Sequence, residues 1–366
     1  MKIVILSNST WNIYNFRKDI LKFFLEKGDE IYVIAPDNYN LKQKIKKINL
    51  VNIRLNNTNI FYDIIYIIRL FFLFKSIKPD LILSFNIKPN IFSGIINFFF
   101  NYKIIANVTG LGSSIIKKSS KRKIIFFLYK LSFKNITHIF FQNPDDRKIF
   151  TKLGITNIEN TSIVPGSGIN INNYNYNSNK FYTNKFIYIG RFLKDKGMIE
   201  LMEAIKIILL NNKNKIKFVF VGKFDEDNPS SINKNDFIKF VNNYNIEYHP
   251  FSENIIDIYN QSDALILPSY REGTPRVILE AMALGVNVLT SNAVGCKHII
   301  DDNKNGLIFL KKNKQDIIKT INKFISLDNI VKINMIKNAR QTVENKFDIK
   351  ILIDIYDKKI NEILND

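Results

Sequence analysis

The segment Ala264–Thr290, which reads ALILPSYREGTPRVILEAMALGVNVLT, decides the fold most clearly. Short aliphatic runs at its two ends, Ala264–Leu267 and Asn287–Thr290, have the length and composition of buried β-strands. Between them lie a polar loop and then Val277–Leu284, whose apolar residues follow helical spacing. A strand, a helix and a second strand in this order form a βαβ unit, which predicts a parallel sheet covered by helices.

The same alternation extends along the whole chain. In the first half we predict strands at Lys2–Leu6, Glu30–Ala35, Val51–Leu55, Leu81–Ser84, Ile104–Asn107 and His138–Gln142, and helices at Phe16–Glu26, Phe61–Lys75 and Lys121–Lys134. In the second half we predict further strands at Lys185–Gly190, Lys217–Val221 and Ile246–His249, and helices at Met198–Leu210, Lys314–Ile325, Val331–Asn345 and Ile349–Leu364. The fold class is therefore α/β, with two Rossmann-like doubly wound domains facing each other across a cleft.

A linker separates the two series of strands. The turn Pro165-Gly166-Ser167-Gly168 ends the first series, and an Asn- and Tyr-rich stretch follows it. We therefore predict domains at 1–168 and 169–348, with a C-terminal helix at 349–366 that packs back toward the N-terminal domain.

Composition and charge limit the classes of protein. The formal charge is +20, from 53 Lys and Arg against 33 Asp and Glu, which indicates nucleic acid, an anionic membrane or acidic small substrates as partners. A general bias toward Lys, Asn, Ile and Phe explains part of the same excess. The one cysteine, Cys296, allows no intramolecular disulfide. The apolar stretches Ile60–Phe74 and Ile91–Phe100 are too short to span a bilayer, and no export signal opens the chain, so we expect a cytoplasmic protein.

The loop and helix after Leu267 carry two carboxylates. Glu272 precedes the helix and Glu280 lies on it, with Gly273, Thr274 and Pro275 between them at the helix start. A helix N-terminus favours a phosphate group, so this segment can address two parts of one phosphorylated ligand. The alternative is a solvated loop followed by an ordinary helical glutamate.

A cationic turn follows the strand that ends near Ile189. It contains Gly190, Arg191, Lys196 and Gly197. Arginine binds phosphate with a two-pronged fork and lysine as a point charge, so Arg191 and Lys196 can converge on a diphosphate. The alternative is a solvated turn.

Two strand ends of the N-terminal domain also carry polar residues. Lys88 follows one of them and can meet an acceptor diphosphate. Asn107, Thr109 and Gly110 follow the next, where glycine permits close approach of a backbone. The alternative is structural, because Pro89 starts a helix and a Gly-x-Gly pattern is a weak signal.

Acidic clusters at Asp145–Asp146, Asp225–Asp227 and Asp301–Asp302 are better explained as surface turns than as metal ligands. The three histidines show no ligand spacing. Two cations on a diphosphate also make a divalent ion redundant, so we predict no metal and no cofactor.

Together these motifs resemble the retaining GT-B glycosyltransferases of family 4, also described as glycosyl transferases group 1. The family pattern G-R-x4-K-G matches Gly190–Gly197, and its E-x7-E pair matches Glu272 and Glu280. More narrowly, Thr109–Ser113, Leu131–Lys134 and Leu267–Tyr270 resemble N-acetylgalactosaminyltransferases that act on undecaprenyl-diphosphate-linked bacillosamine.

The resemblance implies a function and roles. It implies transfer of a hexose or N-acetylhexosamine from a UDP-sugar to an undecaprenyl-diphosphate-linked saccharide, in surface glycan, O-antigen or glycoprotein glycan assembly, with retention of configuration. It gives the acceptor to domain 1–168 and the nucleotide-sugar to domain 169–348. Arg191 and Lys196 neutralise the departing UDP, Glu272 binds donor-sugar hydroxyls beside Gly273 and Thr274, and Glu280 binds the ribose. The alternatives are a sugar-nucleotide epimerase or phosphorylase of the same shape and a nonspecific basic nucleic-acid-binding protein.

A basic run in the N-terminal domain suggests contact with the inner face of the cell membrane. Lys117, Lys118 and Lys121–Lys123 precede the apolar segment Ile124–Leu128, and cations beside apolar side chains are typical of a peripheral membrane surface. The alternative is that these apolar side chains are buried faces of a domain helix.

Overall fold

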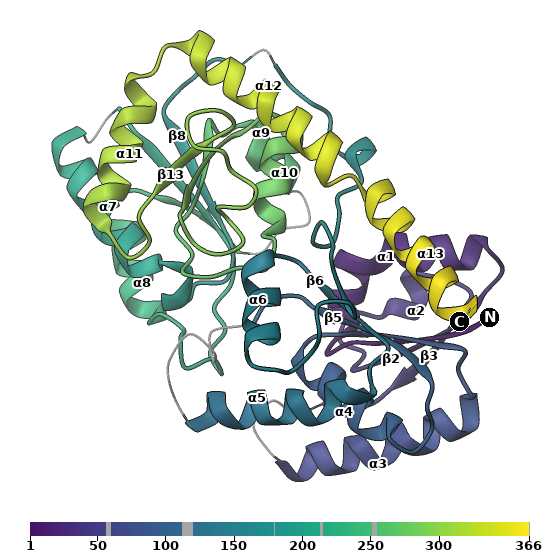
Figure 1. The fold of residues 1–366 in the computed structure, drawn as a ribbon. Helices are drawn as coiled ribbons and strands as arrows, with labels where there is room; N and C mark the ends of the chain where they lie inside the picture. Colours follow the sequence, from purple (N-terminus) through teal and green to yellow (C-terminus); the bar gives the residue numbers. More distant parts are fainter. Residues whose placement is uncertain (56–59, 112–119, 179, 213–214, 251–254, 366) are drawn as a thin grey trace. The chain divides into compact units, whose positions relative to one another are not determined.

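The chain divides into two compact units. The structure, a computed structural model, describes residues 1–55, 60–111, 120–178, 180–212, 215–250 and 255–365. One unit contains Met1–Gly168 together with Ile349–Asp366, and the other contains Ile169–Asp348. Each has a parallel β-sheet with helices packed on it (Figure 1), which confirms the predicted α/β class.

The first unit has a seven-stranded parallel sheet in the order β3-β2-β1-β4-β5-β6-β7. Its strands are β1 (Lys2–Leu6), β2 (Glu30–Ala35), β3 (Ile48–Asn52), β4 (Leu81–Phe85), β5 (Lys103–Val108), β6 (His138–Phe141) and β7 (Thr161–Ile163). Its helices are α1 (Thr10–Glu26), α2 (Leu41–Lys44), α3 (Ile60–Ile77), α4 (Ile87–Asn97), α5 (Ser120–Ser132), α6 (Pro144–Lys152) and α13 (Ile349–Asn365), with a 3₁₀ turn at Phe133–Asn135.

Two hydrophobic cores cover the two faces of this sheet. Successive side chains of a strand point to opposite faces, so Val4 and Leu6 join one core while Ile3 and Ile5 join the other. Helices α3, α4 and α5 pack on the first core, and α1 and α13 on the second. The C-terminal helix is therefore part of the first unit: the Tyr356 ring lies 4.8 Å from that of Phe140.

The second unit has a six-stranded parallel sheet in the order β10-β9-β8-β11-β12-β13. Its strands are β8 (Lys185–Ile189), β9 (Lys217–Val221), β10 (Glu247–His249), β11 (Ala264–Leu267), β12 (Asn287–Ser291) and β13 (Leu307–Phe309). Its helices are α7 (Met198–Asn212), α8 (Lys234–Asn243), α9 (Ile255–Asn260), α10 (Arg276–Leu284), α11 (Lys314–Ser326) and α12 (Asn329–Lys346), with 3₁₀ turns at Ile171–Asn173 and Lys194–Lys196.

Some elements differ from the sequence predictions. The strand predicted at Val51–Leu55 is wrong by three residues, because β3 pairs with β2 in the register Ile31 to Ile48. Strands β7 and β13 were not predicted, since three residues give too short a pattern. Asp145 and Asp146 lie in the first turn of α6 and not in a surface turn, and Asp146 is buried against its N-cap residue Asn143. None of the described helices combines the length and hydropathy that crossing a bilayer requires.

Candidate active site

The cationic turn and the loop before α10 meet at the carboxyl edge of the second sheet. Gly197 ends the turn after β8 with φ +72°, and a Cβ there would lie 2.2 Å from the carbonyl oxygen of Pro268. No larger residue fits this approach without displacing one of the two loops. The amide of Tyr270 donates to the carbonyl of Asp195 over 2.9 Å and fixes the same contact.

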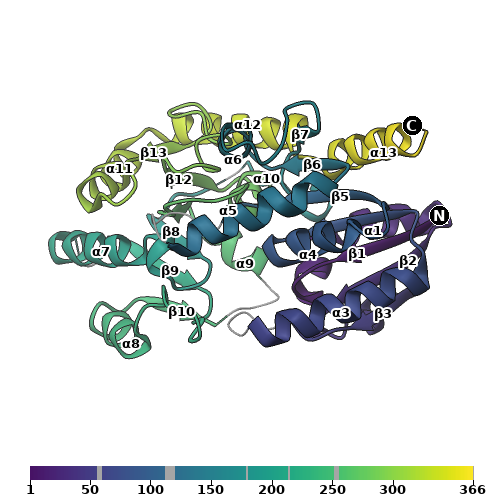
Figure 2. The same cartoon turned by 60° about the horizontal axis from the view of Figure 1, so that its bottom comes forward.

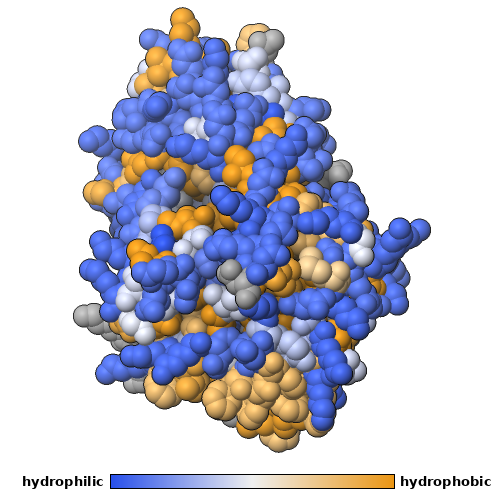
Figure 3. Space-filling model, turned by 45° about the vertical axis from the view of Figure 1, so that its right-hand side comes forward, coloured by the Kyte–Doolittle hydropathy of each residue, from blue (hydrophilic) through white to orange (hydrophobic). Residues whose placement is uncertain are grey.

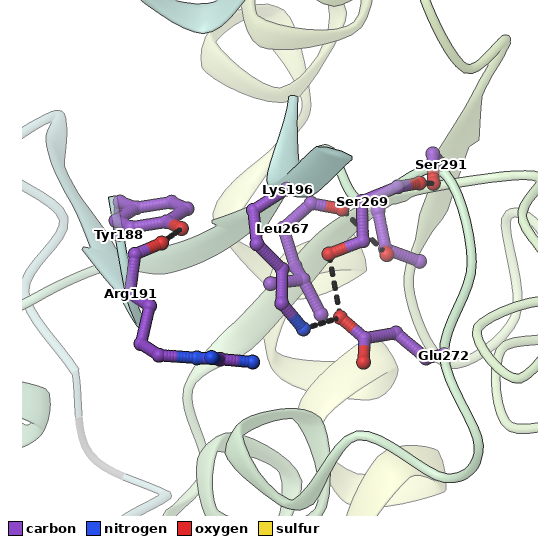
Figure 4. A network of polar contacts seen from close by, with 8 residues as sticks. Tyr188, Arg191, Lys196, Leu267, Ser269, Glu272 and Ser291 are labelled. Carbon is purple, nitrogen blue, oxygen red and sulfur yellow. Dashed lines mark hydrogen bonds and ion pairs between the residues drawn. The ribbon is translucent and has the colours of Figure 1, made fainter. Parts of the chain in front are cut away.

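Lys196 and Glu272 form an ion pair at this contact (Figure 4). The ammonium nitrogen of Lys196 lies 2.5 Å from Oε1 of Glu272, and Oγ of Ser269 donates to the same oxygen over 2.6 Å. Only 23% of the lysine side chain and 13% of the glutamate side chain are exposed. The carbonyl of Ser269 accepts a hydrogen bond of 2.5 Å from Ser291, which ties the loop to the end of β12. The pair is thus held from two strands.

Arg191 lies two residues beyond the end of β8, and its side chain is more exposed than that of Lys196. Its carbonyl oxygen accepts a hydrogen bond of 2.8 Å from the buried hydroxyl of Tyr188, whose pKa is raised by burial. Its guanidinium is half exposed and lies 2.7 Å from Asp225. Gly190 before it has φ +153°, and its carbonyl would lie 1.9 Å from a Cβ on Gly222. The backbone at Arg191 is therefore fixed, while its side chain faces solvent.

Glu280 has a separate set of partners on α10. Its Oε1 accepts from Nε of Arg276 over 2.9 Å and from the hydroxyl of Tyr174 over 3.2 Å. Burial, followed by the charge of Glu280, raises the pKa of Tyr174 to about 12. The two carboxylates predicted to act together thus lie in two different networks, one at the loop and one in the second turn of the helix.

The loop between them is tightly packed. Gly273 is buried, Thr274 is half-buried, and Pro275 is the N-cap residue of α10. Gly295 has φ +89°, and a Cβ on it would lie 2.5 Å from the carbonyl oxygen of Gly273. This second glycine contact holds the loop from the side of β12.

Sequence reasoning gave no role to Ser269, Ser291 or Cys296, which surround the pair. Ser269 lies two residues after β11 and Ser291 is the last residue of β12, and these positions are the sequence signal that could have indicated them. Burial, followed by the charge of Glu272, raises the pKa of the Cys296 thiol to about 12. This thiol is therefore protonated at neutral pH and is a poor nucleophile.

The predicted acceptor-side residues lie in the first unit. The ammonium of Lys88, in the first turn of α4, lies 2.7 Å from Asp63 of α3. Asn107 is buried: its amide donates to the carbonyl of Ser84 over 3.2 Å, and its Oδ1 accepts from Tyr356 of α13. These contacts favour a structural role for Asn107. Thr109 and Gly110 follow β5 and are half-buried, with φ +123° at the glycine.

Part of the basic run that was predicted to contact the membrane lies outside the described residues. Lys117 and Lys118 lie outside the described residues, as does the side chain of Lys121. In the first turn of α5, Arg122 is half-buried and Lys123 is exposed. Among the described residues, no group of three His, Cys, Asp or Glu side chains is arranged to hold a metal ion.

Comparison with known proteins gives the same assignment in both halves. Residues 2–143 match a family described as glycosyl transferase 4-like, and residues 176–342 match glycosyl transferases group 1. Neither family is one of epimerases or nucleic-acid-binding modules, so these alternatives gain no support.

Two curated relatives align over most of the chain. One is the N,N'-diacetylbacillosaminyl-diphospho-undecaprenol alpha-1,3-N-acetylgalactosaminyltransferase of Campylobacter jejuni, 29% identical over 99% of this chain and 100% of the relative. Another is the UDP-Gal:alpha-D-GlcNAc-diphosphoundecaprenol alpha-1,3-galactosyltransferase of Escherichia coli, 25% identical over 84% of this chain and 82% of the relative.

Solved structures share the fold. Sucrose-phosphate synthase from Thermosynechococcus elongatus superposes with a TM-score of 0.85 at 15% identity, covering 100% of this chain and 99% of that one. HepE of Anabaena in complex with UDP and glucose gives 0.78 at 16% identity, covering 99% of this chain and 100% of that one. The fold, the two matched families and the full-length relatives agree, and the chain belongs to the glycosyl transferases of group 1, family 4, with the GT-B fold.

Proposed function

We propose that the protein transfers a hexose or N-acetylhexosamine from a UDP-sugar to an undecaprenyl-diphosphate-linked saccharide, as a step in surface or glycoprotein glycan assembly. Retention of configuration, independence from metal and cofactor, and peripheral association with an anionic membrane belong to the same proposal. The Lys196–Glu272 pair carries it, because it places a cation and a carboxylate side by side at the carboxyl edge of a parallel sheet, where such folds bind their ligands.

The geometry of Glu272 supports the donor assignment. Lys196 and Ser269 both donate to its Oε1, and in the described part of the chain its Oε2 has no hydrogen-bond partner. That oxygen can accept hydrogen bonds from sugar hydroxyls. The ammonium of Lys196, which lies beside this carboxylate, can then contact a phosphate oxygen of the same donor.

The names of the two relatives support the substrate classes. Both contain diphospho-undecaprenol as the acceptor carrier, and one contains a UDP-sugar as donor. The solved complex of HepE, which shares the fold, contains UDP and glucose, and this supports a UDP-sugar as the donor.

In the proposed reaction the acceptor hydroxyl bonds to the anomeric carbon on the face from which UDP departs. The bond from that carbon to the β-phosphate oxygen breaks, its electron pair leaves with UDP, and the hydroxyl proton passes to the departing phosphate. The charge that develops on the diphosphate is stabilised by Lys196 and Arg191, and cations fixed in advance are effective because they need no reorganisation. In this proposal Lys196 and Arg191 neutralise the diphosphate, the task that a divalent ion performs in metal-dependent enzymes.

A donor panel tests the proposal. The protein is incubated with UDP-glucose, UDP-galactose, UDP-N-acetylglucosamine and UDP-N-acetylgalactosamine, together with polyprenyl-diphosphate-linked saccharides. We expect one donor to release UDP and to increase the mass of the lipid-linked product by one sugar, equally with and without EDTA. UDP release without a heavier lipid-linked product would overturn the acceptor assignment, and loss of activity in EDTA that Mn²⁺ restores would overturn metal independence. NMR of the product then gives the anomeric configuration, which should be that of the donor.

A further inference from the structure

Helix α3 of the first unit has apolar side chains on two opposite sides. Side chains three or four residues apart share one side of a helix. Tyr66, Leu70 and Phe74 form the buried side. The opposite side is also apolar, with 52% to 62% of each residue exposed at Phe61, Ile64, Ile68 and Phe72. A surface helix of a water-soluble domain normally turns polar side chains outward, so this exposed stripe indicates an interaction surface.

The stripe continues onto the end of α4. The Phe71 ring lies 5.7 Å from that of Phe72 and 5.7 Å from that of Phe99, and Phe99 lies 5.5 Å from Phe98. Phe98 and Phe99 are among the most exposed aromatic residues in the described part of the chain. Four neighbouring rings therefore join α3 to the turn after α4.

Helix α5 adds a second stripe. Ile124, Phe127 and Leu131 are exposed at helical spacing, while Tyr129 between them is buried. Helices α3 and α5 both pack against α4, and Figure 2 shows the three side by side at the front of the view. Figure 3 shows hydrophobic residues gathered at the lower end of the molecule, the end at which Figure 1 places α3. We call the exposed apolar side chains of α3, of Phe98–Phe99 and of α5 the apolar face.

The charges around the apolar face have one sign. Exposed cations stand beside the apolar stripes at Arg69 and Lys75 on α3 and at Lys123 and Lys130 on α5. The one carboxylate within residues 60–78 and 98–134 is Asp63, which Lys88 neutralises at 2.7 Å. Apolar side chains with a cationic rim fit a lipid surface with anionic headgroups.

We propose that the apolar face docks on an anionic phospholipid bilayer. The biological purpose of this docking rests on the proposed function, whereas the test of docking does not depend on sugar transfer. A second copy of the chain is a poorer partner, because a symmetric dimer through this face would set its cations against their own copies. The location also suits a lipid-linked acceptor. Lys88, which is predicted to meet the acceptor diphosphate, is paired with Asp63 at the start of α3. The docking surface extends well beyond the basic run predicted from the sequence.

A matched pair of variants tests the proposal by co-sedimentation with vesicles of phosphatidylcholine containing phosphatidylglycerol. The face variant carries Ile64→Ser, Ile68→Ser and Phe72→Ser. The control variant carries Phe181→Ser, Leu210→Ser and Ile330→Ser, which remove three apolar side chains from the second unit that are even more exposed than those of the face variant. Burying one such side chain is worth about tenfold or more in a partition coefficient, so the face variant should bind about 100-fold more weakly or worse, and the control variant like the parent.

Salt separates the apolar contribution from the electrostatic one. Replacing Arg69, Lys75, Lys123 and Lys130 by Gln should weaken binding at low salt and leave the residual binding at high salt unchanged, whereas the face variant should lose both. Equal binding of the parent and the face variant would overturn the proposal. A dimer in solution that the face variant abolishes, with vesicle binding unchanged, would overturn it in favour of a second copy.

A gain-of-signal variant makes the result independent of any folding defect. Phe98→Trp places an indole on the apolar face, and Ile330→Trp places one on the second unit as its control. With vesicles and no sugar donor, we expect a blue shift of the added emission and protection from acrylamide for Phe98→Trp only. Equal behaviour of the two variants would contradict docking through this face. Docking without any sugar transfer would leave this surface standing and overturn the proposed function alone.

Discussion

The two units build the same kind of sheet and present opposite chemistry. The second unit places ion pairs at the carboxyl edge of its sheet, Lys196–Glu272 and Arg191–Asp225. At the end of β5 in the first unit, Asn107 is bonded to Tyr356 of the C-terminal helix. The first unit instead exposes apolar helix faces, with aromatic residues at Phe61, Phe72, Phe98, Phe99 and Phe127, whereas the described part of the second unit exposes a large aromatic side chain at Phe181.

Under the proposed function, this difference lets one scaffold serve two substrates. A nucleotide-sugar is polar and doubly charged at its diphosphate, so its unit needs fixed cations and carboxylates. An acceptor on a polyprenyl chain remains in the bilayer, so its unit needs a surface that reaches the lipid. The sheet itself decides neither role, and the loops and outer helix faces decide both.

The largest expected effect is the loss of kcat when a cation at the carboxyl edge of the second sheet is removed. Lys196→Ala should lower kcat by about 10²–10³-fold, the usual loss for one charge-stabilising donor in a partly desolvated site. Arg191→Ala should cost less, about tenfold, because its half-exposed guanidinium is screened by solvent. Steady-state kinetics with the preferred donor measures both.

Lys194→Ala is the matched control, since it removes an exposed cation from the same turn. It should leave kcat close to that of the parent. If Lys194→Ala and Lys196→Ala reduced kcat equally, the effect would reflect the net charge of the turn and not the Lys196–Glu272 pair.

A smaller effect, on the free energy of unfolding, is expected when alanine replaces either of two glycines that have similar φ angles. Gly197→Ala should lower the free energy of unfolding of the second unit by about 2–3 kcal/mol, because strain at φ +72° adds to the contact with Pro268. Gly28→Ala in the first unit, at φ +80° with no atom within 4 Å, should cost only about 1 kcal/mol. Urea unfolding of the two variants compares them, and equal losses would show that the loop contact is unimportant.

The smallest expected effect is on how the free energy of unfolding of the first unit depends on pH. Burial, then the charge of Lys359, lowers the pKa of His138 from 6.5 to about 4, while Glu362 acts in the opposite direction and Arg147 in the same one. Folding thus favours the neutral ring, so the stabilisation is complete above pH 6.5 and is lost as the pH falls toward 4.

The variant His138→Asn should reduce the change in the free energy of unfolding between pH 6.5 and pH 4 by about 1–2 kcal/mol. Urea unfolding of the parent and the variant across the same pH window measures the difference. Identical pH dependence in the two proteins would contradict the assignment to His138.

The sequence predicted the sheets well and the site only in part. Long periodic segments such as α7 and buried strands such as β1 have patterns that local sequence determines. Three-residue strands such as β13 lack a pattern. The register of β3 depends on its pairing with β2, which the local sequence of β3 does not determine. The motif spacing identified Lys196 and Glu272, but not that they pair, because that contact depends on the approach of Gly197 to Pro268.

The apolar face is a second feature that the sequence alone could not predict. The sequence shows that Ile60–Ile77 is apolar, and both a buried helix and a lipid-facing one give that composition. Only the packing of Tyr66, Leu70 and Phe74 against the sheet shows which stripe is left outside. The basic run near residue 120 is visible in the sequence as a run of charges, whereas the exposure of an apolar stripe depends on packing.

Hydrogen–deuterium exchange with two ligands tests the division of roles between the units most directly. The account predicts that UDP slows exchange in Gly190–Gly197 and in residues 268–275 of the second unit, and leaves the first unit unchanged. Anionic vesicles should slow exchange at the start of α3 and at Phe98–Asn101, and leave the second unit unchanged. Protection of the first unit by UDP, with none at Gly190–Gly197, would contradict the account.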